Sequence, residues 1–388
     1  MIGWDVDPVV AEWRSRPRLE TIERADLCVV GLGGSGLAAI GEAIRRGLSV
    51  VGLDAGRVAA GAAGRNGGFL LGGPALAIHQ AEVAWGRSEA LALYRQTLEE
   101  ITALADLLGP EVVRRVGSIR LAGLPAASVD EDEVDEHAEW LDCLEQKRAL
   151  TQAGIAVREY HGALGRGLLL PDDAAVNPAR RALGLAALYA GSARLYENSP
   201  VVSVRPGGVD TEAGSVRADL VLVAVDGRLE ELLPELKGLV RTARLQMLAT
   251  DPLPGAVRRR VPRPVYARWG YDYAQCDPSG RLFVGGGRDR FEASEWTTAT
   301  EPSEPVQRWI EAVAGRFAGQ AVAVSHRWGA SVGFTPDARP LIGFVRPGVL
   351  ACGGYNGTGN LVGPIAARAA LALALDGRMP SPVFHHLG

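Results

Sequence analysis

The sequence predicts an α/β fold in which a Rossmann-like dinucleotide-binding domain is joined to a second domain built on an antiparallel sheet. An apolar stretch runs directly into a Gly-x-Gly-x-x-Gly motif at residues 31–36. A second glycine-rich segment follows an apolar stretch at residues 353–359, and several segments with strand periodicity separate the two. At 388 residues the chain also exceeds the usual size of one hydrophobic core, so two domains are expected.

The overall composition is that of an ordinary globular protein. The net charge of -4 argues against a nucleic-acid partner. The four cysteines show no CxxC spacing, so we expect buried free thiols in a reducing compartment and no metal site. No apolar stretch reaches the roughly 20 residues of a membrane span, and residues 1–24 lack the apolar core of a signal peptide. We therefore expect a cytoplasmic protein without a membrane span.

Residues 27–54 have the outline of a βαβ unit, with a strand at 27–31, a helix at 35–46 and a strand at 49–54. Gly31 permits the tight turn, Gly33 allows the backbone to approach a pyrophosphate, and Gly36 lets the helix pack close on the strand. Asp54 ends the second strand, where an acid accepts hydrogen bonds from ribose hydroxyls. A structural glycine turn is the alternative, and the surrounding strand, helix and acid favour the dinucleotide site.

A glycine-rich segment, Gly61-Ala62-Ala63-Gly64-Arg65-Asn66-Gly67-Gly68-Phe69, follows this unit. Its glycine content argues against a helix or a central strand and favours a loop that lets the backbone approach a ligand closely. A flexible linker is the alternative. The segment lacks the serine, proline or charged residues typical of linkers, which disfavours that alternative.

The rest of the chain is expected to alternate between helices and strands, after an irregular extension at 1–24 that covers the first strand. Helical periodicity and capping residues predict helices at 76–108, 130–153, 178–190, 228–235, 303–317 and 361–376. The acidic run at 130–133 is interpreted as a solvated first helical turn and not as a metal site. Apolar or alternating patterns predict strands at 112–122, 194–197, 201–204, 209–212, 215–218, 220–225, 240–250, 265–276, 281–287, 321–328 and 349–352.

These motifs together resemble those of the FAD-dependent amine and amino-acid oxidoreductases, the superfamily of D-amino-acid oxidase, glycine oxidase and sarcosine oxidase. Within it the chain is most similar to the gamma-glutamylputrescine oxidoreductase branch. The resemblance covers nearly the whole chain after about residue 20. It rests on the 31–36 motif with Asp54, the GRNGG loop at 64–68, and the segments 117–122, 281–287, 328–329, 335–343 and 353–357.

The resemblance implies non-covalent FAD in a Rossmann-like domain of the glutathione-reductase type, assigned to residues 1–78, 150–228 and 322–388. The antiparallel-sheet substrate domain is assigned to 79–149 and 229–321. The implied FAD-binding residues are Gly31, Gly33, Gly34, Ser35, Gly36, Asp54, Ala55, Gly61, Ala62, Arg65, Asn66, Gly67, Gly68, Val202, Gly354, Tyr355, Asn356, Gly357, Thr358 and Gly359.

Three departures from the superfamily pattern bear on substrate and acceptor. Val332 occupies the place of the arginine that clamps a substrate carboxylate in glycine-oxidase-like members. Ala330 replaces the cysteine that bonds the flavin in sarcosine-oxidase-like members, and Phe283 replaces their lysine over the flavin. A simple α-amino acid therefore loses its usual partner, and slow reaction with oxygen is expected.

Candidate catalytic residues are Tyr271, Tyr273 and Arg288. The two tyrosines are expected to alternate along one face of the strand at 265–276, above the substrate, although an ordinary aromatic pair gives the same pattern. Arg288 follows the glycines at 285–287 and is a candidate for holding a distal carboxylate, with a surface arginine as the alternative. No arrangement of carboxylates, histidines or nucleophiles indicates another chemistry.

We therefore expect oxidation of an amine or N-substituted amino compound by hydride transfer to flavin N5, giving an imine that hydrolyses. The partners are a small-molecule amine or amino acid and oxygen or another electron acceptor. Oxidation of D-amino acids or glycine is the nearest alternative. A nicotinamide dehydrogenase and a non-catalytic flavin-binding protein are alternatives of other classes. The sequence leaves the substrate, the acceptor and the oligomeric state undetermined.

Overall fold

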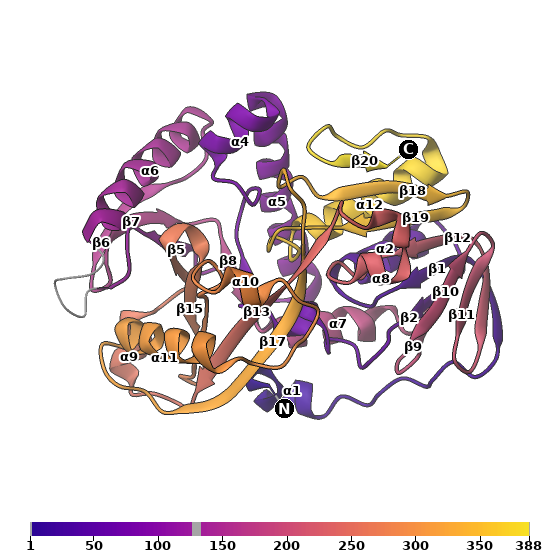
Figure 1. Ribbon diagram of the computed structural model, residues 1–388, viewed down its shortest axis with the longest axis horizontal. Helices are drawn as coiled ribbons and strands as arrows, with labels where there is room; N and C mark the ends of the chain where they lie inside the picture. The colour runs from indigo at the N-terminus through magenta and orange to yellow at the C-terminus, as the bar shows by residue number, and fades with distance from the viewer. Residues whose placement is uncertain (1, 126–132, 388) are drawn as a thin grey trace. The chain divides into compact units, whose positions relative to one another are not determined.

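A computed structural model describes residues 2–125 and 133–387 (Figure 1). The described residues form two compact units. The first contains the residues up to Val6, Asn66–Asn177 and Arg244–Ala330, and the second contains Asp7–Arg65, Pro178–Ala243 and Ser331 onwards. The predicted boundaries of the FAD-binding and substrate domains stay a prediction, because the division into two compact units does not show which segments bind a cofactor or a substrate.

The second unit is built on the predicted βαβ motif. Strand β1 (Ile22–Val30) leads through α2 (Gly34–Arg45) to β2 (Val50–Leu53), and the two strands pair in parallel. The sheet has the order β20-β18-β19-β12-β1-β2-β9, where β9 is Arg194–Tyr196, β12 Ser215–Val223, β18 Leu341–Arg346, β19 Val349–Gly353 and β20 His385–Leu387. Parallel pairing of β1 with β2 and β12, and of β12 with β19, confirms the Rossmann-like prediction.

The two faces of this sheet are covered differently. Helix α2 packs on β1 and β2 and contacts both α12 (Val362–Asp376) and α7 (Pro178–Tyr189), and α12 packs on β18 and β19. On the other side, Cys28, Val30 and Val221 share an apolar cluster with β10 (Val201–Arg205) and β11 (Gly208–Thr211). Strands buried on both faces explain why the segments at 27–30 and 220–223 are continuously apolar.

The first unit holds an eight-stranded sheet of order β17-β13-β16-β15-β14-β5-β7-β6. The recorded pairs are antiparallel except β14 with β5, which is parallel. The strands are β5 Ser118–Leu121, β6 Arg158–Gly162, β7 Gly165–Leu170, β13 Arg241–Thr250, β14 Val265–Ala267, β15 Asp272–Cys276, β16 Leu282–Gly285 and β17 Val324–Phe334. Helix α11 (Glu304–Ala318) packs on β15 and β16 through Ile310, Ala314 and Phe317.

The remaining elements are shorter or lie beside the sheets. A small sheet joins β3 (Phe69–Leu70), β8 (Ala174–Val176) and β4 (Val113–Arg114). The other helices are η1 Gly3–Val6, α1 Pro8–Ala11, α3 Ala62–Arg65, α4 Ile78–Trp85, α5 Arg87–Leu108, α6 Glu133–Gln152, α8 Leu229–Leu232, η2 Pro234–Leu236, α9 Gly255–Arg260, η3 Arg268–Gly270 and α10 Glu292–Glu295.

Several predicted elements were wrong in detail. The helix at 76–108 is two helices, because Gly86 adopts a left-handed φ of 90° between α4 and α5. The strands predicted at 215–218 and 220–225 are one strand, β12, and strands β6, β7 and β8 were not expected. Residues 22–24 belong to β1, not to an irregular extension. Of the acidic run, 130–132 lies outside the described residues.

Candidate cofactor and substrate site

The first glycine junction, residues 31–36, has the backbone geometry of a phosphate-binding turn. Gly31 has a φ of 99°, and a Cβ at Gly36 would lie 1.8 Å from the carbonyl oxygen of Gly31. Helix α2 starts after Gly33 without a side-chain cap. Its first amide groups therefore keep their donor capacity for a ligand, and the helix N-terminus favours an anion there.

Asp54 lies beside this junction at the end of β2. Its Oδ2 accepts a hydrogen bond from the Leu32 amide at 2.9 Å, and its Oδ1 accepts one from the Gly56 amide at 3.0 Å. Burial raises the pKa of the carboxyl to about 6, against the effect of these two donors. Each oxygen retains a further lone-pair site, so the carboxylate has the capacity to accept from ribose hydroxyls. Ala55 follows it and is exposed.

The glycine-rich segment after Asp54 contains a short helix, contrary to prediction. Residues Ala62–Arg65 form α3, and a Cβ at Gly64 would lie 2.1 Å from the Ala59 carbonyl oxygen. Gly61 has open space around it, so its backbone is unobstructed. In the other unit, the Asn66 Oδ1 accepts from the Gly68 amide at 2.8 Å, which turns the chain at Gly67 and Gly68.

The second glycine junction, residues 353–359, is fastened to the end of β17. The Asn356 Nδ2 donates to Thr335 Oγ1 at 3.0 Å, and the Thr335 amide donates to Asn356 Oδ1 at 3.0 Å. The Thr358 Oγ1 donates to the Tyr355 carbonyl oxygen at 2.7 Å. Two glycines here need a left-handed φ, 68° at Gly354 and 89° at Gly357.

Both junctions belong to the second unit, and one hydrogen bond joins them. Ser35 Oγ donates to Tyr355 Oη at 2.8 Å, and both side chains are buried. Gly363, in the first turn of α12, leaves room for this contact, since a Cβ there would lie 2.5 Å from Ser35 Oγ. The structure thus brings together two motifs that are some 320 residues apart in sequence.

Most amides of the second junction already have intramolecular acceptors. The amides of residues 354, 355, 356 and 358 donate to Asp226, Asp226, Gly333 and Tyr355 respectively. Within the described chain no such acceptor is recorded for Gly357 and Gly359. These two amides, with the N-terminus of α12, are therefore the candidates for a ligand carbonyl or anion.

Two residues of this unit were not anticipated from the sequence. Arg181 of α7 is buried, lies against Gly34 and donates to the side-chain and main-chain oxygens of Asn360 at 3.0 and 2.7 Å. Asp226 lies three residues after the end of strand β12, directly after the apolar stretch 220–225, and accepts from the amides of three residues. The acid after an apolar strand, the same pattern as at Asp54, is the signal that could have revealed it.

One predicted cofactor residue lies apart from the junctions. Val202 is on β10 with its side chain 60% exposed, and β10 pairs with β11 and not with β1 or β2. Its assignment as a cofactor contact stays a prediction.

The candidate substrate residues lie in the first unit, and one premise about them was wrong. Segment 265–276 is interrupted by the 3-10 turn at Arg268–Gly270, where Arg268, Trp269 and Gly270 have φ values of 50°, 54° and 93°. Tyr271 follows this turn in a helical conformation, so it does not alternate with Tyr273 on one strand face.

Tyr273 and Arg288 have well-defined surroundings. The Tyr273 ring lies against the Cα of Gly285, where a Cβ would come within 2.4 Å, and meets the Phe69 ring edge-on at 5.8 Å. The guanidinium of Arg288 lies 5.6 Å from the ring centroid of Tyr271 and 5.5 Å from that of Trp296. Aromatic rings beside a guanidinium fix the orientation of its plane.

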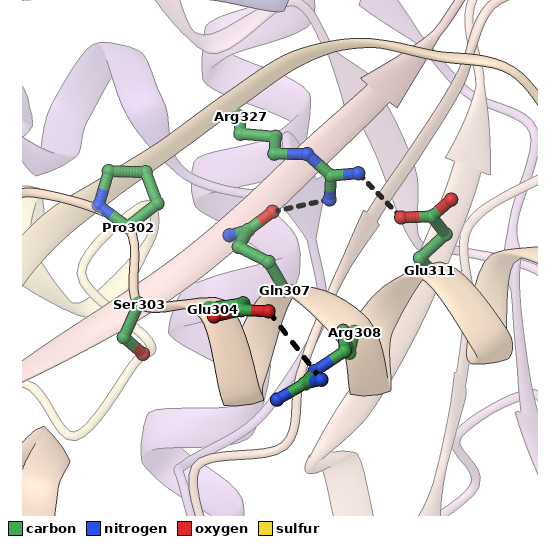
Figure 2. Close-up of a pocket in the computed structure, with 7 residues that line it drawn as sticks. All are labelled: Pro302, Ser303, Glu304, Gln307, Arg308, Glu311 and Arg327. Carbon is green, nitrogen blue, oxygen red and sulfur yellow. Dashed lines mark hydrogen bonds and ion pairs between the residues drawn. The ribbon is translucent and has the colours of Figure 1, made fainter.

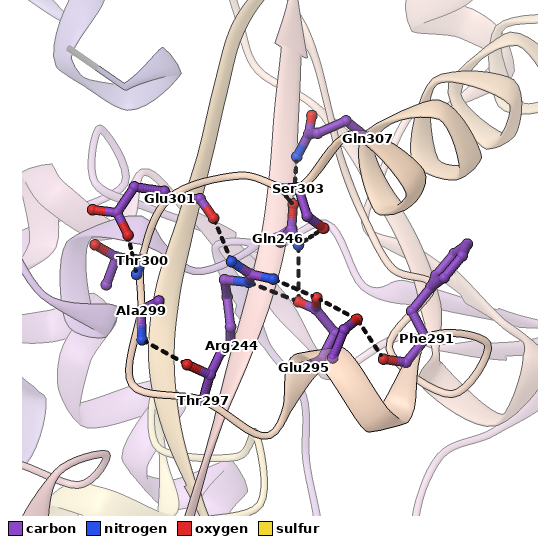
Figure 3. Close-up of polar contacts among 11 residues, drawn as sticks. Arg244, Gln246, Phe291, Glu295, Thr297, Ala299, Thr300, Glu301, Ser303 and Gln307 are labelled. Carbon is purple, nitrogen blue, oxygen red and sulfur yellow. Dashed lines mark hydrogen bonds and ion pairs between the residues drawn. The ribbon is translucent and has the colours of Figure 1, made fainter.

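A buried polar network holds the segment that carries Trp296 (Figure 3). Arg244 of β13 donates to Glu295 through Nε at 3.0 Å and Nη2 at 2.7 Å, and Gln246 Nε2 donates to Glu295 Oε2 at 2.8 Å. The carbonyl oxygen of Glu301 accepts from Arg244 Nη1 at 2.6 Å. The loop after Arg288 is therefore tied to the sheet.

A surface hollow in the same unit shares no residue with the predicted site (Figure 2). Within it Arg327 pairs with Glu311 and Arg308 with Glu304, and Arg327 donates to Gln307 at 3.1 Å. Because these charged groups in the hollow pair with one another, we assign no ligand to the hollow.

The replaced superfamily positions are apolar and buried. Phe283 stacks on Trp4 with ring centroids 3.5 Å apart and meets Trp328 edge-on at 6.3 Å. Val332 and Ala330 are buried on β17. The four cysteines are free and buried, as predicted. Among the described residues no group of three metal-ligating side chains occurs, and no helix is long and apolar enough to cross a membrane.

The donor set of the second unit suits a dinucleotide. It offers an uncapped helix N-terminus for phosphates, a carboxylate with spare acceptor sites for a ribose, and two unengaged glycine amides at a second junction. The residues present therefore fit FAD.

Comparisons with known proteins agree with this description. The family described as FAD dependent oxidoreductase (DAO) matches residues 26–373. A probable oxidoreductase OrdL of Rhizobium meliloti (strain 1021) is 27% identical over 380 residues, covering 92% of this chain and 85% of that protein. The gamma-glutamylputrescine oxidoreductase of Escherichia coli (strain K12) is 26% identical over 364 residues, covering 88% and 82%. The crystal structure of glycine oxidase from Geobacillus kaustophilus superimposes with a TM-score of 0.71 at 18% identity, covering 94% of this chain and 100% of that chain.

Proposed function

The chain belongs to the DAO family of FAD-dependent oxidoreductases, and from this premise we propose that it oxidises the C–N bond of an amine or N-substituted amino compound. The carbon bearing nitrogen loses a hydride, the nitrogen lone pair forms the C=N bond and a proton leaves the nitrogen. Water then hydrolyses the imine to a carbonyl compound and ammonia, or an amine where the nitrogen is substituted. Hydride acceptance at N5 is the chemistry that FAD supplies when bound.

The observation that carries this proposal is the joining of the two glycine junctions through Ser35 and Tyr355. In the proposed arrangement the first junction and α2 hold the pyrophosphate, and Asp54 holds the adenosine ribose. The amides of Gly357 and Gly359 face the flavin carbonyl region, where negative charge accumulates on reduction. Arg65 is proposed to contact the phosphates or the flavin.

The proposed substrate residues are Tyr273, Tyr271 and Arg288. Tyr273 is assigned to the amine, with Tyr271 and Arg288 at the far end of the substrate. Val332 provides no cation for an α-carboxylate, which supports an amine or N-substituted compound over a free amino acid. The similarity to a gamma-glutamylputrescine oxidoreductase supports an amine substrate as well. In gamma-glutamylputrescine the carboxylate lies at the end of the molecule away from the putrescine amine.

The acceptor of the electrons is proposed to be either oxygen or another oxidant. Phe283, buried against Trp4, stands where a lysine promotes the oxygen reaction in sarcosine-oxidase-like members. We expect slow reoxidation by oxygen and faster reoxidation by a dye, measured by stopped-flow absorbance after anaerobic reduction.

The test is anaerobic bleaching of the flavin absorbance in the purified holoprotein. The panel contains polyamines, gamma-glutamylated amines, N-methyl amino acids, glycine and both enantiomers of common amino acids. Reduction by amines is expected. Reduction by D-amino acids or glycine alone would move the assignment to a D-amino-acid or glycine oxidoreductase, and no reduction by any compound would favour a non-catalytic flavin-binding protein.

A matched pair of variants tests the role of Arg288. Arg288→Gln is expected to lower kcat/KM for an amine with a distal carboxylate roughly 10- to 100-fold, the effect of losing a charge-assisted hydrogen bond, and to leave an uncharged amine nearly unaffected. Arg290→Gln, two residues on, is the control. Equal losses for both amines would contradict a carboxylate-binding role.

A further inference from the structure

One carboxylate ties together three separate segments around the second glycine junction. Asp226 Oδ1 accepts from the Gly354 amide at 2.9 Å and from the Tyr355 amide at 3.2 Å. Its Oδ2 accepts from the Gly333 amide at 3.1 Å. The end of β12, the end of β17 and the turn after β19 thus meet at a single side chain.

The glycines around Asp226 are required by this convergence. A Cβ at Gly333 would lie 2.8 Å from Asp226 Oδ1, and a Cβ at Gly227 would lie 2.7 Å from the Ser331 carbonyl carbon. A Cβ at Gly353 would lie 3.2 Å from Asp226 Cα. Asp226 itself has a φ of 52°, in the left-handed region that non-glycine residues seldom adopt. Strain of this kind is kept where the surrounding contacts require it.

We propose that Asp226 is a positioning residue for the cofactor. It fixes the second junction so that the amides of Gly357 and Gly359 face the flavin, and its negative charge behind the junction lowers the flavin reduction potential. This rests on the position proposed above for FAD. An anion near a group that gains negative charge on reduction makes that reduction less favourable.

Asp226 is the group near the second glycine junction whose charge changes with pH near neutrality. Burial raises its pKa to about 6, and hydrogen bonds from backbone amides oppose that rise, so the group is mainly ionised at neutral pH. The titratable groups that face it are Cys352 on β19 and Tyr355, and burial raises the pKa of both. Both therefore stay neutral where Asp226 titrates.

Charged residues on the following turn are engaged elsewhere. Arg228 pairs with Glu231 at 2.8 Å, and Glu230 accepts from Thr242 Oγ1 at 3.3 Å. The pKa shift of Asp226 has burial and backbone donors as its causes, and neither Arg228 nor Glu230 is one of them.

The test compares Asp226→Asn with Asp219→Asn, which removes an exposed carboxylate from the same strand. The measurements are the Kd of FAD for the apoprotein, the midpoint potential of the bound flavin at pH 7.5 and its visible spectrum. Asp226→Asn is expected to weaken FAD binding roughly 10-fold or more, because a buried donor is left without its acceptor. It is also expected to shift the potential to a more positive value. Asp219→Asn should match the wild type.

Unchanged affinity and potential in a folded Asp226→Asn protein would overturn the proposal. If that variant does not fold, the wild-type holoprotein provides the test. Because coupling between two sites is reciprocal, the plot of midpoint potential against pH should bend near pH 6, and a straight plot from pH 5 to 8 would overturn the proposal. These measurements need no amine, so failure of amine oxidation leaves them valid, whereas an apoprotein that binds no FAD refutes the proposed cofactor position itself.

Discussion

Ser35 Oγ and Tyr355 Oη are 2.8 Å apart and join the N-terminus of α2 to the turn before α12. Both side chains are buried, at 5% and 3% exposure, so neither hydroxyl has water as an easy substitute partner. The hydrogen bond couples the two ends of the proposed FAD site. A substitution at one junction should therefore change ligand binding at the other junction.

Tyr355→Phe is expected to weaken FAD binding about 2- to 10-fold, the effect of a net hydrogen-bond contribution of about 1 kcal/mol. Fluorescence quenching during titration of the apoprotein with FAD measures this. Ser35→Ala should have a similar effect, and the double variant should be no weaker than the single ones, since both remove the same bond. Additive losses would show that the two hydroxyls act independently.

Gly36→Ala is expected to abolish FAD binding and to lower the unfolding free energy by several kcal/mol. The added Cβ would lie 1.8 Å from the carbonyl oxygen of Gly31, so α2 must move away from β1. Gly191→Ala is the matched control, because nothing lies within 4 Å of its Cβ and its φ is not left-handed. Thermal unfolding and flavin content of the two purified proteins provide the comparison. Equal flavin content would contradict the close-packing role of Gly36.

The features that could be predicted from the sequence are those with a local signal. The 31–36 motif, the apolar strands beside it and Asp54 form one continuous pattern, and the structure contains the βαβ unit that this pattern predicts. The hydrogen bonds of Asp226 and Arg181 involve residues more than 100 positions away in the sequence. The presence of an aspartate or an arginine at these positions therefore did not predict the hydrogen bonds.

The turn at 268–270 is a feature of backbone structure that the local sequence also could not predict. Arg268 and Trp269 adopt left-handed φ values that their residue types disfavour. Tertiary contacts stabilise the turn: Arg268 Nη1 lies 3.3 Å from Asp272 Oδ2, and Asp272 Oδ1 accepts from Trp309 Nε1 at 3.0 Å. The alternating pattern of residues across 265–276 does not indicate these tertiary contacts, so the predicted strand was too long.

Glu295→Gln is expected to destabilise the protein by about 3 kcal/mol. The change leaves the Arg244 guanidinium, whose side chain is 10% exposed, without its carboxylate. Arg244→Met combined with Glu295→Leu should recover much of that loss, since it removes both charges from the interior. Urea unfolding of the three proteins measures the energies. Glu304→Gln, in the exposed pair with Arg308, should change nothing measurable, and a double variant as unstable as Glu295→Gln would refute the buried-charge explanation.

The carboxyl of Asp173 is expected to make the protein less stable as pH rises. It is 1% exposed and accepts from the Gly72 amide at 2.7 Å and from Ser118 Oγ at 2.5 Å, yet burial raises its pKa to about 7 from an ordinary value of 3.8. Between these values the folded protein holds a proton that the unfolded chain has lost. The unfolding free energy from this group therefore falls as pH rises from about 4 to about 7, by up to about 1.36 kcal/mol per pH unit.

Asp173→Asn removes this titration while keeping the shape of the side chain. The unfolding free energy of the wild type minus that of the variant should therefore become steadily lower as pH rises from about 4 to about 7, and it should be constant above pH 8. Urea unfolding at each pH gives that difference. A pH-independent difference would mean that the carboxyl of Asp173 is already ionised across this range and that its two donors outweigh the effect of burial.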